Sequence, residues 1–235
     1  MSAAKLTITL ENISHCYGGI LSLDQISYQF ATGSLTAVFG PNGGGKSTLL
    51  KIIAGILKPT SGTIRSHIKY ISDLAYLAQG KDIDRTFPIH VEDVVAMGLW
   101  PKIGVFRGLG RDDLPLVDDA LAQVGLVGFN KRCLTELSGG QLQRLFFARL
   151  IAQQANFILL DEPFTGIDAN TTKDLLGLIQ RWHQQGKTII AVLHDMTIIQ
   201  QFFPTCLLIS RKLVAAGASD DVLTIENLAK AAFNV

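Results

Sequence analysis

The sequence predicts an α/β fold, a parallel β-sheet covered by helices, with an antiparallel β edge and an inserted helical subdomain. Three observations lead to this prediction. Short apolar stretches typical of strands alternate with longer segments of helical periodicity, the pattern that parallel sheets produce. From about residue 80 to residue 154 the strand-like stretches disappear and helical patterns remain. A glycine-rich turn directly follows one apolar stretch and opens a helix, as phosphate-binding turns do.

The predicted strands are short and apolar. They cover residues 5–10, 26–30, 35–39, 74–78, 157–160, 188–193 and 206–210. The first two lie close together in the chain, so they are the candidates for the antiparallel edge.

Helical periodicity marks the segments between and after these strands. One helix is predicted over 46–57, where Pro59 and Gly62 stop it, and another over 168–184, where Gly186 is placed to cap the C-terminus. Further helical patterns cover residues 91–100, 112–125, 138–154 and, at the end of the chain, 224–235, while 99–110 is predicted to be a loop. We therefore expect one domain over 1–235, with an α/β core from 1–79 and 155–235 and a helical subdomain from 80–154.

Bulk properties exclude several classes of protein. The formal net charge is +1, which does not favour general binding to nucleic acid. Three widely separated cysteines make neither a disulfide framework nor a metal cluster, and the first residues lack the apolar run of a signal peptide. No stretch reaches the roughly 18 uninterrupted apolar residues of a membrane span. These features indicate a soluble protein of a reducing cytoplasm.

The segment GPNGGGKS, residues 40–47, fits the phosphate-binding pattern G-x-x-x-x-G-K-[ST]. Glycines let backbone N–H groups turn toward phosphate, and the N-terminus of the following helix adds a favourable dipole. Lys46 is expected to reach the β- and γ-phosphates of ATP, and the Ser47 hydroxyl to ligate Mg²⁺. The predicted nucleotide-binding residues here are Gly40, Pro41, Asn42, Gly43, Gly44, Gly45, Lys46, Ser47 and Thr48.

Two acidic residues follow the buried apolar stretch 157–160. Asp161 and Glu162 are expected at the carboxyl end of this strand, where open α/β sheets bind their ligands. Asp161 is the candidate partner of Mg²⁺. Glu162 is placed to polarise an attacking water as a general base.

A second glycine-rich helix start lies in LSGGQ, residues 137–141. Ser138 and Gln141 fit a capping box, which is a sufficient structural explanation for those two residues. The cap does not explain Gly139 and Gly140, since a glycine in a helix costs about 1 kcal/mol relative to alanine. Close approach of a phosphate to the backbone would explain them. We therefore expect Ser138 to Gln141 to contact the γ-phosphate of ATP bound to a second copy of the chain, in a head-to-tail dimer.

These motifs, in this order, resemble those of the nucleotide-binding subunits of ABC transporters over nearly the whole chain. The resemblance implies the ABC ATPase fold, with a P-loop NTPase core, and ATP hydrolysis. It implies that Tyr17 stacks on adenine, although packing on the core is an alternative for this side chain. It also implies that Gln79 senses Mg²⁺ and the γ-phosphate, that Asp168 belongs to a loop crossing the dimer interface, and that His194 contacts the γ-phosphate. Glu162, His194, Lys46 and Gln79 are thus the expected catalytic residues, and Ser47, Gln79 and Asp161 the expected metal contacts.

Residues 82–107, 162–168 and 211–217 resemble the corresponding segments of zinc- and manganese-type metal-ion importers. That resemblance implies import of Zn²⁺, Mn²⁺ or Fe²⁺ and a location at the inner face of the cell membrane. The implied partners are integral membrane permease subunits and, indirectly, an extracytoplasmic metal-binding protein. Importers of cobalamin or iron–siderophore chelates are the neighbouring alternative.

Two alternatives lie outside membrane transport. A soluble ABC ATPase acting on ribosomes or DNA usually has two cassettes or a long coiled-coil insertion, which this sequence lacks. A nucleotide switch without hydrolysis is disfavoured by Glu162 and His194.

Large apolar residues are candidates for the surface that docks on the permease. Phe87, Trp100 and Phe106 lie among predicted loops near Gln79, and core packing is their alternative role. If they are exposed, they are expected to line a groove that receives a short permease helix.

Overall fold

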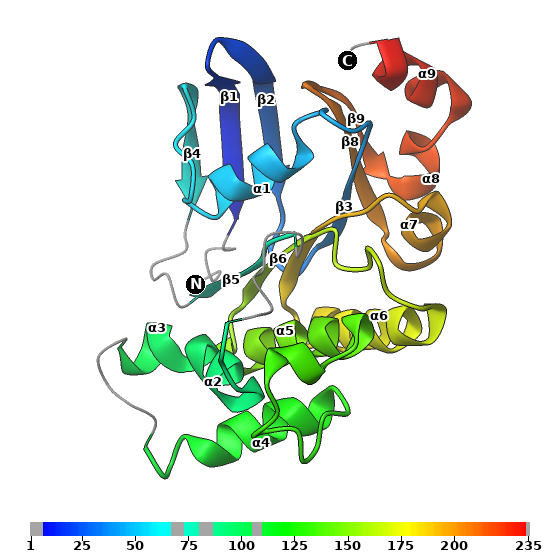
Figure 1. Ribbon diagram of the computed structural model, residues 1–235. Helices are drawn as coiled ribbons and strands as arrows, with labels where there is room; N and C mark the ends of the chain where they lie inside the picture. Colours follow the sequence, from blue (N-terminus) through cyan, green and yellow to red (C-terminus); the bar gives the residue numbers. More distant parts are fainter. Residues whose placement is uncertain (1–6, 67–72, 80–86, 105–109, 234–235) are drawn as a thin grey trace, which may run out of the picture.

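The computed structural model describes residues 7–66, 73–79, 87–104 and 110–233. Within these ranges the strands form two sheets, which occupy the upper and middle parts of Figure 1. Helices α2 to α5 lie below them, and α6 runs beside α5 (Figure 1).

The larger sheet is mainly parallel. Over the described residues it has six strands in the order β5-β6-β7-β3-β8-β9. Their bounds are β3 Leu35–Phe39, β5 Leu74–Leu77, β6 Phe157–Asp161, β7 Thr188–Val192, β8 Thr205–Ser210 and β9 Lys212–Ala218. All neighbouring pairs are parallel except β8 and β9, which are antiparallel. The α/β fold with a mainly parallel sheet is therefore confirmed, whereas its antiparallel edge strand, β9, was not predicted.

The smaller sheet is antiparallel throughout. Its described strands are β1 Ile8–Tyr17, β2 Ile20–Phe30 and β4 Ser61–Ser66, in the order β2-β1-β4. The expected antiparallel pair near the start of the chain is therefore present, but it forms a separate sheet. The sequence pattern missed β4 because its residues, SGTIRS, are mostly polar and exposed.

The helices follow the predicted periodicity with shifted ends. Their bounds are α1 Lys46–Ile53, α2 Val91–Ala96, α3 Trp100–Ile103, α4 Leu114–Gln123, α5 Gly139–Gln153, α6 Ala169–Gln184, α7 Met196–Phe202, α8 Ser219–Val222 and α9 Ile225–Phe233, with 3-10 turns η3 Met97–Leu99 and η4 Leu134–Glu136. The prediction of a helix to residue 57 was wrong, since α1 ends at Ile53 and a turn with Gly55 in a left-handed conformation follows. The predicted loop 99–110 begins instead with α3, and residues 105–109 lie outside the described ranges.

The larger sheet is buried on both faces. On β7, Ile189 and Ala191 belong to the cluster that packs under α5 and α6, whereas Ile190 and Val192 belong to the cluster shared with α1 and the small sheet. This alternation follows from the two-residue period of a strand and explains why β6 and β7 are apolar throughout. The strands are thus fixed from both sides, and their carboxyl ends form a rigid edge.

The helical segment between β5 and β6 shares its core with the sheet. Residues of α2, α4 and α5 belong to the same buried cluster as β3 and β7. The ring of Phe147 on α5 stacks on Trp182 of α6, with centroids 5.8 Å apart. The division into a core of 1–79 and 155–235 and a subdomain of 80–154 stays a prediction, since packing joins the two parts. None of the helices in the described ranges combines the length and the apolar character that a membrane crossing requires.

Candidate functional site

The glycine-rich segment forms a tight turn between β3 and α1. Gly40 has φ 149° and Gly45 has φ 90°, a region that side chains rarely adopt. A Cβ on Gly40 would lie 1.9 Å from the Ile209 carbonyl oxygen, and one on Gly45 would lie 2.4 Å from the Ser22 carbonyl oxygen. These two glycines are therefore required by close backbone packing as well as by the turn.

Lys46 lies at the first turn of α1 with its ammonium folded back on the loop. Its Nζ donates to the carbonyl oxygens of Gly40 at 2.8 Å and Pro41 at 2.7 Å. Burial lowers the pKa of Lys46, and the nearby Glu162 and Asp161 carboxylates oppose this shift. The cation is thus held at the mouth of the loop by weak neutral acceptors, which an anionic ligand can replace.

Asp161 ends β6 and is buried, with a hydroxyl on each carboxylate oxygen. Ser47 Oγ donates to Oδ1 at 2.9 Å, and Tyr76 Oη donates to Oδ2 at 3.2 Å. Burial raises the pKa of Asp161, and these two hydrogen bonds oppose the shift. A buried carboxylate beside a serine hydroxyl is a hard oxygen donor set of the kind that Mg²⁺ prefers, so these residues fit the expected ion. Among the described residues no group of three or more His, Cys, Asp and Glu side chains could hold a metal ion.

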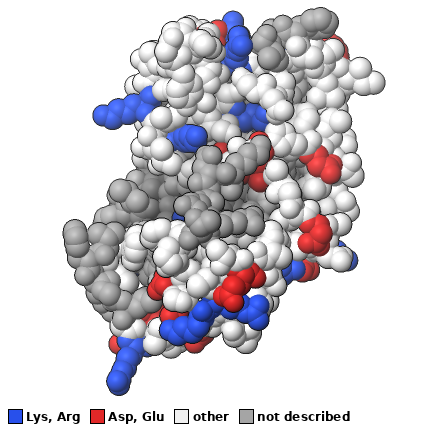
Figure 2. Space-filling view, viewed as in Figure 1, with Lys and Arg blue, Asp and Glu red and all other residues white. Residues whose placement is uncertain are grey.

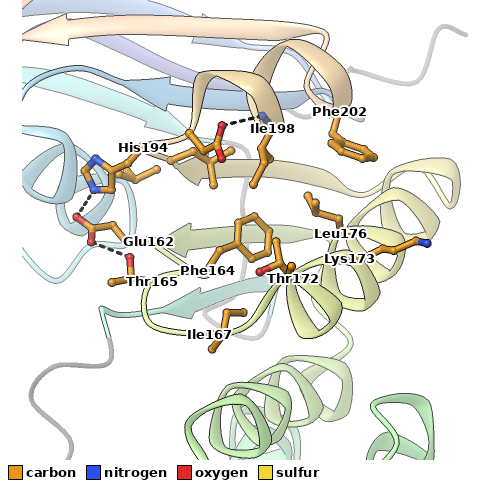
Figure 3. Close-up of a pocket in the computed structure, with 14 residues that line it drawn as sticks. Glu162, Phe164, Thr165, Ile167, Thr172, Lys173, Leu176, His194, Ile198 and Phe202 are labelled. Atoms are coloured by element: carbon orange, nitrogen blue, oxygen red, sulfur yellow. Dashed lines mark hydrogen bonds and ion pairs between the residues drawn. The ribbon is translucent and has the colours of Figure 1, made fainter.

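Glu162, the next residue, is held by three side chains. Its Oε1 pairs with His194 Nε2 at 2.6 Å, and its Oε2 accepts from Gln79 Nε2 at 2.6 Å and from Thr165 Oγ1 at 3.2 Å. Figure 3 shows His194 and Thr165 on either side of the Glu162 carboxylate. Burial raises the pKa of Glu162, but hydrogen bonds from these groups outweigh it and lower the pKa overall.

The backbone of Glu162 is in a left-handed conformation, with φ 51°. Its N–H donates to the Val192 carbonyl oxygen at 3.2 Å, which ties the residue to the end of β7. A left-handed non-glycine residue costs free energy, and such residues concentrate at functional sites. Here the turn directs the carboxylate toward His194 and Gln79.

These groups converge on one hollow of about 670 Å³ at the carboxyl edge of the large sheet. It is lined by Ser22, Asn42, Gly43, Gly44, Gly45, Lys46, Ser47, Thr48, Gln79, Glu162, Thr165 and His194. The phosphate loop and the expected catalytic residues Lys46, Gln79, Glu162 and His194 therefore meet, as the sequence predicts. On the face seen in Figure 2, the Lys, Arg, Asp and Glu side chains of the described residues are scattered among uncharged ones.

A second cavity, of about 490 Å³, lies behind the Glu162–His194 pair between α6 and α7 (Figure 3). It shares Glu162, Thr165 and His194 with the first hollow, and the rest of its lining includes the apolar residues Phe164, Ile167, Leu176, Ile198 and Phe202. The carboxylate–imidazole pair thus has polar surroundings on the phosphate side and apolar surroundings behind it.

The LSGGQ segment lies at the start of α5, and its capping box is formed. Ser138 N donates to Gln141 Oε1 at 2.9 Å, and Gln141 N donates to Ser138 Oγ at 3.2 Å. A Cβ on Gly140 would lie 3.0 Å from Thr171 Oγ1 and 3.3 Å from Asp168 Oδ2, whereas on Gly139 the nearest atom would be 3.6 Å away. The expectation that both glycines serve an approaching phosphate stays a prediction. Gly140 has an additional packing reason within the chain, whereas no close contact within the described structure explains Gly139.

Neither LSGGQ nor Tyr17 joins the hollow within one chain. None of Ser138, Gly139, Gly140 and Gln141 is among the described residues that line it. Tyr17 is 47% exposed at the turn between β1 and β2, so it is not a core residue. Its ring meets that of His15 edge-on, with centroids 4.6 Å apart. Asp168 caps α6 by accepting from Thr171 N at 2.9 Å and from Thr171 Oγ1 at 2.7 Å.

Three residues of the site were missed by the sequence analysis. Ser22, on β2, lines the hollow and its Oγ lies 3.0 Å from Thr48 Oγ1. Thr165 contacts Glu162. Because Thr165 follows Glu162 by three residues, a turn between them could have been expected to bring the hydroxyl to the carboxylate. Tyr76 contacts Asp161 and is the one polar side chain in the strand LAYL, which was also a signal.

The apolar candidates for docking are exposed where they are described. Phe87 is 61% exposed and Trp100 is 38% exposed, so the alternative of core packing is wrong for both. Phe106 lies outside the described residues.

Comparison with known proteins relates this geometry to a family. The family model described as "ABC transporter" matches residues 23–165. The manganese transport system ATP-binding protein MntB of Listeria innocua is 38% identical over 225 residues, covering 94% of each chain. The zinc transport system ATP-binding protein TroB of Treponema pallidum is 34% identical over 235 residues, covering 98% of this chain and 88% of the relative.

A solved structure agrees with these relatives. The fold superposes with a TM-score of 0.85 on a metal-chelate type ABC transporter in an inward-facing conformation, at 29% identity over 98% of this chain and 90% of the other. The matched family region contains the phosphate loop, Gln79, the LSGGQ segment, Asp161 and Glu162. The chain therefore belongs to the ABC transporter family, as one of its ATP-binding and ATP-hydrolysing subunits.

Proposed function

We propose that this subunit hydrolyses Mg²⁺-bound ATP to drive a membrane permease that imports a divalent metal ion. The observation that carries the proposal is the single hollow where Lys46, Ser47 and the Glu162–His194 pair meet. Lys46 and Ser47 are suited to bind the phosphates and their cation, and the Glu162–His194 pair is suited to activate a water molecule. Mg²⁺, when bound, would neutralise phosphate charge and be held by Ser47 and Asp161.

The resting hydrogen bonds define what ATP must rearrange. Lys46 would leave the carbonyl oxygens of Gly40 and Pro41 and turn to the β- and γ-phosphates. Glu162 would exchange one of its present partners for the attacking water. The water oxygen bonds to the γ-phosphorus, the bond to the ADP oxygen breaks, and Glu162 accepts the water's proton. His194 and Lys46 would stabilise the charge on the γ-phosphate.

A second copy of the chain would complete each site. The supporting observation is that LSGGQ is separate from the hollow of its own chain while Gly139 is left open. In a symmetric head-to-tail pair, both such segments would face the partner's nucleotide. Tyr17, exposed at the turn between β1 and β2, would stack on adenine, and the segment ending at Asp168 would lie at the dimer interface.

The cargo class rests on the relatives. Relatives named for manganese transport match at 37–39% identity, above the chelated iron transport system protein YfeB of Yersinia pestis at 36% and the metal-chelate type structure at 29%, while the zinc relative TroB matches at 34%. We therefore favour a free divalent ion (Mn²⁺, Zn²⁺ or Fe²⁺) over a siderophore or cobalamin chelate. The ion would pass through permease subunits, delivered to them by an extracytoplasmic metal-binding protein. Phe87 and Trp100 would dock this chain on the permease at the cytoplasmic face of the membrane.

The test is the metal content of cells that lack this chain, grown with limiting trace metals. The intact chain should restore the content of one metal, and Lys46→Ala should not, because it removes the phosphate-binding cation. Restoration by Lys46→Ala would contradict ATP-driven import. A loss confined to a chelated metal supplied as its complex would favour the chelate alternative.

A further inference from the structure

Tyr76 lies on β5, three residues before Gln79, and it contacts the buried acid from the side opposite to Ser47. Its hydroxyl donates to Asp161 Oδ2 at 3.2 Å, while Ser47 Oγ occupies Oδ1. In the sheet Tyr76 pairs with Leu159 of β6, two residues before Asp161. The two hydroxyls thus fix the plane of one carboxylate from two different elements.

Tyr76 lies outside the hollow proposed to hold the phosphates. Ser47 lines the hollow, whereas Tyr76 is not among the described residues that do so. In the described structure the Tyr76 hydroxyl reaches the site through the Asp161 carboxylate, so any effect of Tyr76 on the bound cation is exerted through Asp161.

The strand that carries Tyr76 is held in register by α5. Over the described residues β5 is the edge strand of the large sheet. On α5, Arg149 Nη2 donates to the Tyr76 carbonyl oxygen at 2.8 Å and Gln153 Nε2 donates to that of Leu74 at 2.7 Å. The helix that begins with LSGGQ therefore sets the position of the strand that supports Asp161.

We propose that Tyr76 is a positioning residue that orients Asp161 toward the cation bound with ATP, on a strand clamped by Arg149 and Gln153 of α5. This inference rests on the proposed function, because it requires Asp161 to face a divalent ion. Partners of this kind fix the direction of the ligand's lone pairs, and their loss typically weakens metal affinity about 10–100-fold.

The experiment compares the wild-type chain with Tyr76→Phe, which keeps the ring and removes the hydroxyl. Mn²⁺ serves as the probe, and its free concentration is followed by electron paramagnetic resonance with a non-hydrolysable ATP analogue. Binding of the same analogue in excess chelator gives the affinity without metal. Tyr28→Phe is the matched control, since Tyr28 is a partly buried tyrosine of β2 that packs edge-on against Phe30.

In Tyr76→Phe we expect the Mn²⁺ affinity to fall by about 10-fold or more. Its metal-free nucleotide affinity and melting temperature should stay close to those of Tyr28→Phe. Unchanged Mn²⁺ affinity would overturn the proposal, as would an equal loss of affinity with and without metal. If the wild-type chain binds the analogue without any effect of Mn²⁺, the proposed function itself fails, and this inference fails with it.

Discussion

At the scale of single residues, Asp161 combines burial with charge at a place where a cation is expected. Burial raises its pKa, so the folded chain holds this proton more readily than the unfolded chain. The resulting contribution to stability is present below the unfolded pKa and is lost as the pH rises through the folded pKa. Near neutral pH the ionised carboxylate therefore destabilises the nucleotide-free protein.

Asp161→Asn should consequently raise the melting temperature of the nucleotide-free protein near neutral pH. The difference in melting temperature between variant and wild type should disappear as the pH falls through the raised pKa of Asp161, because the wild-type side chain is then also neutral. Thermal unfolding at several acidic pH values would measure this difference. Asp112→Asn, at an exposed position, is the control. A gap that does not depend on pH would contradict the argument.

Glu162 is the residue on which hydrolysis depends in the proposed mechanism. Glu162→Gln keeps the shape of the side chain and removes the base, so we expect phosphate release to fall by about 10²–10⁴-fold. With ATP and Mg²⁺ the variant should accumulate as a dimer in size-exclusion chromatography. Glu226→Gln, which alters an exposed acid paired with Lys230, should do neither. A variant that stays monomeric at high concentration with ATP would argue against the sandwich dimer.

At the scale of elements, a substitution at the start of α5 can distinguish the structural role of this segment from its proposed role in nucleotide binding. Gly139→Asp places an acid in the first turn of a helix. At an exposed site the helix dipole stabilises such a charge by about 0.3–1 kcal/mol. The same charge would repel a partner's γ-phosphate. We therefore expect an unchanged or higher melting temperature together with loss of ATP-dependent dimerisation and hydrolysis.

The matched variant is Gly139→Ala, which adds volume without charge where the nearest atom would be 3.6 Å away. It should fold normally and retain more ATP-dependent dimer than Gly139→Asp. If Gly139→Asp hydrolyses ATP at the wild-type rate, the segment lies away from the nucleotide and the dimer geometry must be different.

The elements also show what the sequence could predict. The seven predicted strand cores were correct because each carries an apolar run that burial on at least one face requires. β4, β9, α7 and α8 were missed. β4 is polar and exposed, β9 has no buried residue, and α7 and α8 have seven and four residues, too few for a periodic signal. The phosphate loop and Glu162 were predictable from spacing, whereas the Tyr76–Asp161 contact depends on the register of β5 against β6. No local pattern encodes that register.

At the scale of the whole molecule, the site of ATP hydrolysis and the residues proposed to dock on the permease lie on different surfaces. Phe87 is exposed, and it does not line the hollow that holds Lys46 and Glu162 in the described structure. Phe87→Asp should therefore reduce co-purification with the permease by about tenfold or more, the effect of losing an interface anchor worth about 2 kcal/mol. Binding of ATP should be unchanged.

Ile225→Asp provides the control for that variant, because Ile225 is 88% exposed on α9, which lies at the upper end of Figure 1, well away from α2. It should keep both permease association and ATP binding. If Phe87→Asp also keeps both, the docking groove lies elsewhere on the chain.

The buried cluster that unites α2, α4 and α5 with β3 and β7 bears on how such cassettes diversify. A helical segment that shares its core with the sheet is not an interchangeable module. Grafting residues 80–154 from a relative would replace one side of a packed interface and leave the other unchanged, with voids or clashes as the result. On the proposed docking role of Phe87 and Trp100, new permease specificity is therefore easier to acquire by altering such exposed positions than by exchange of the whole segment.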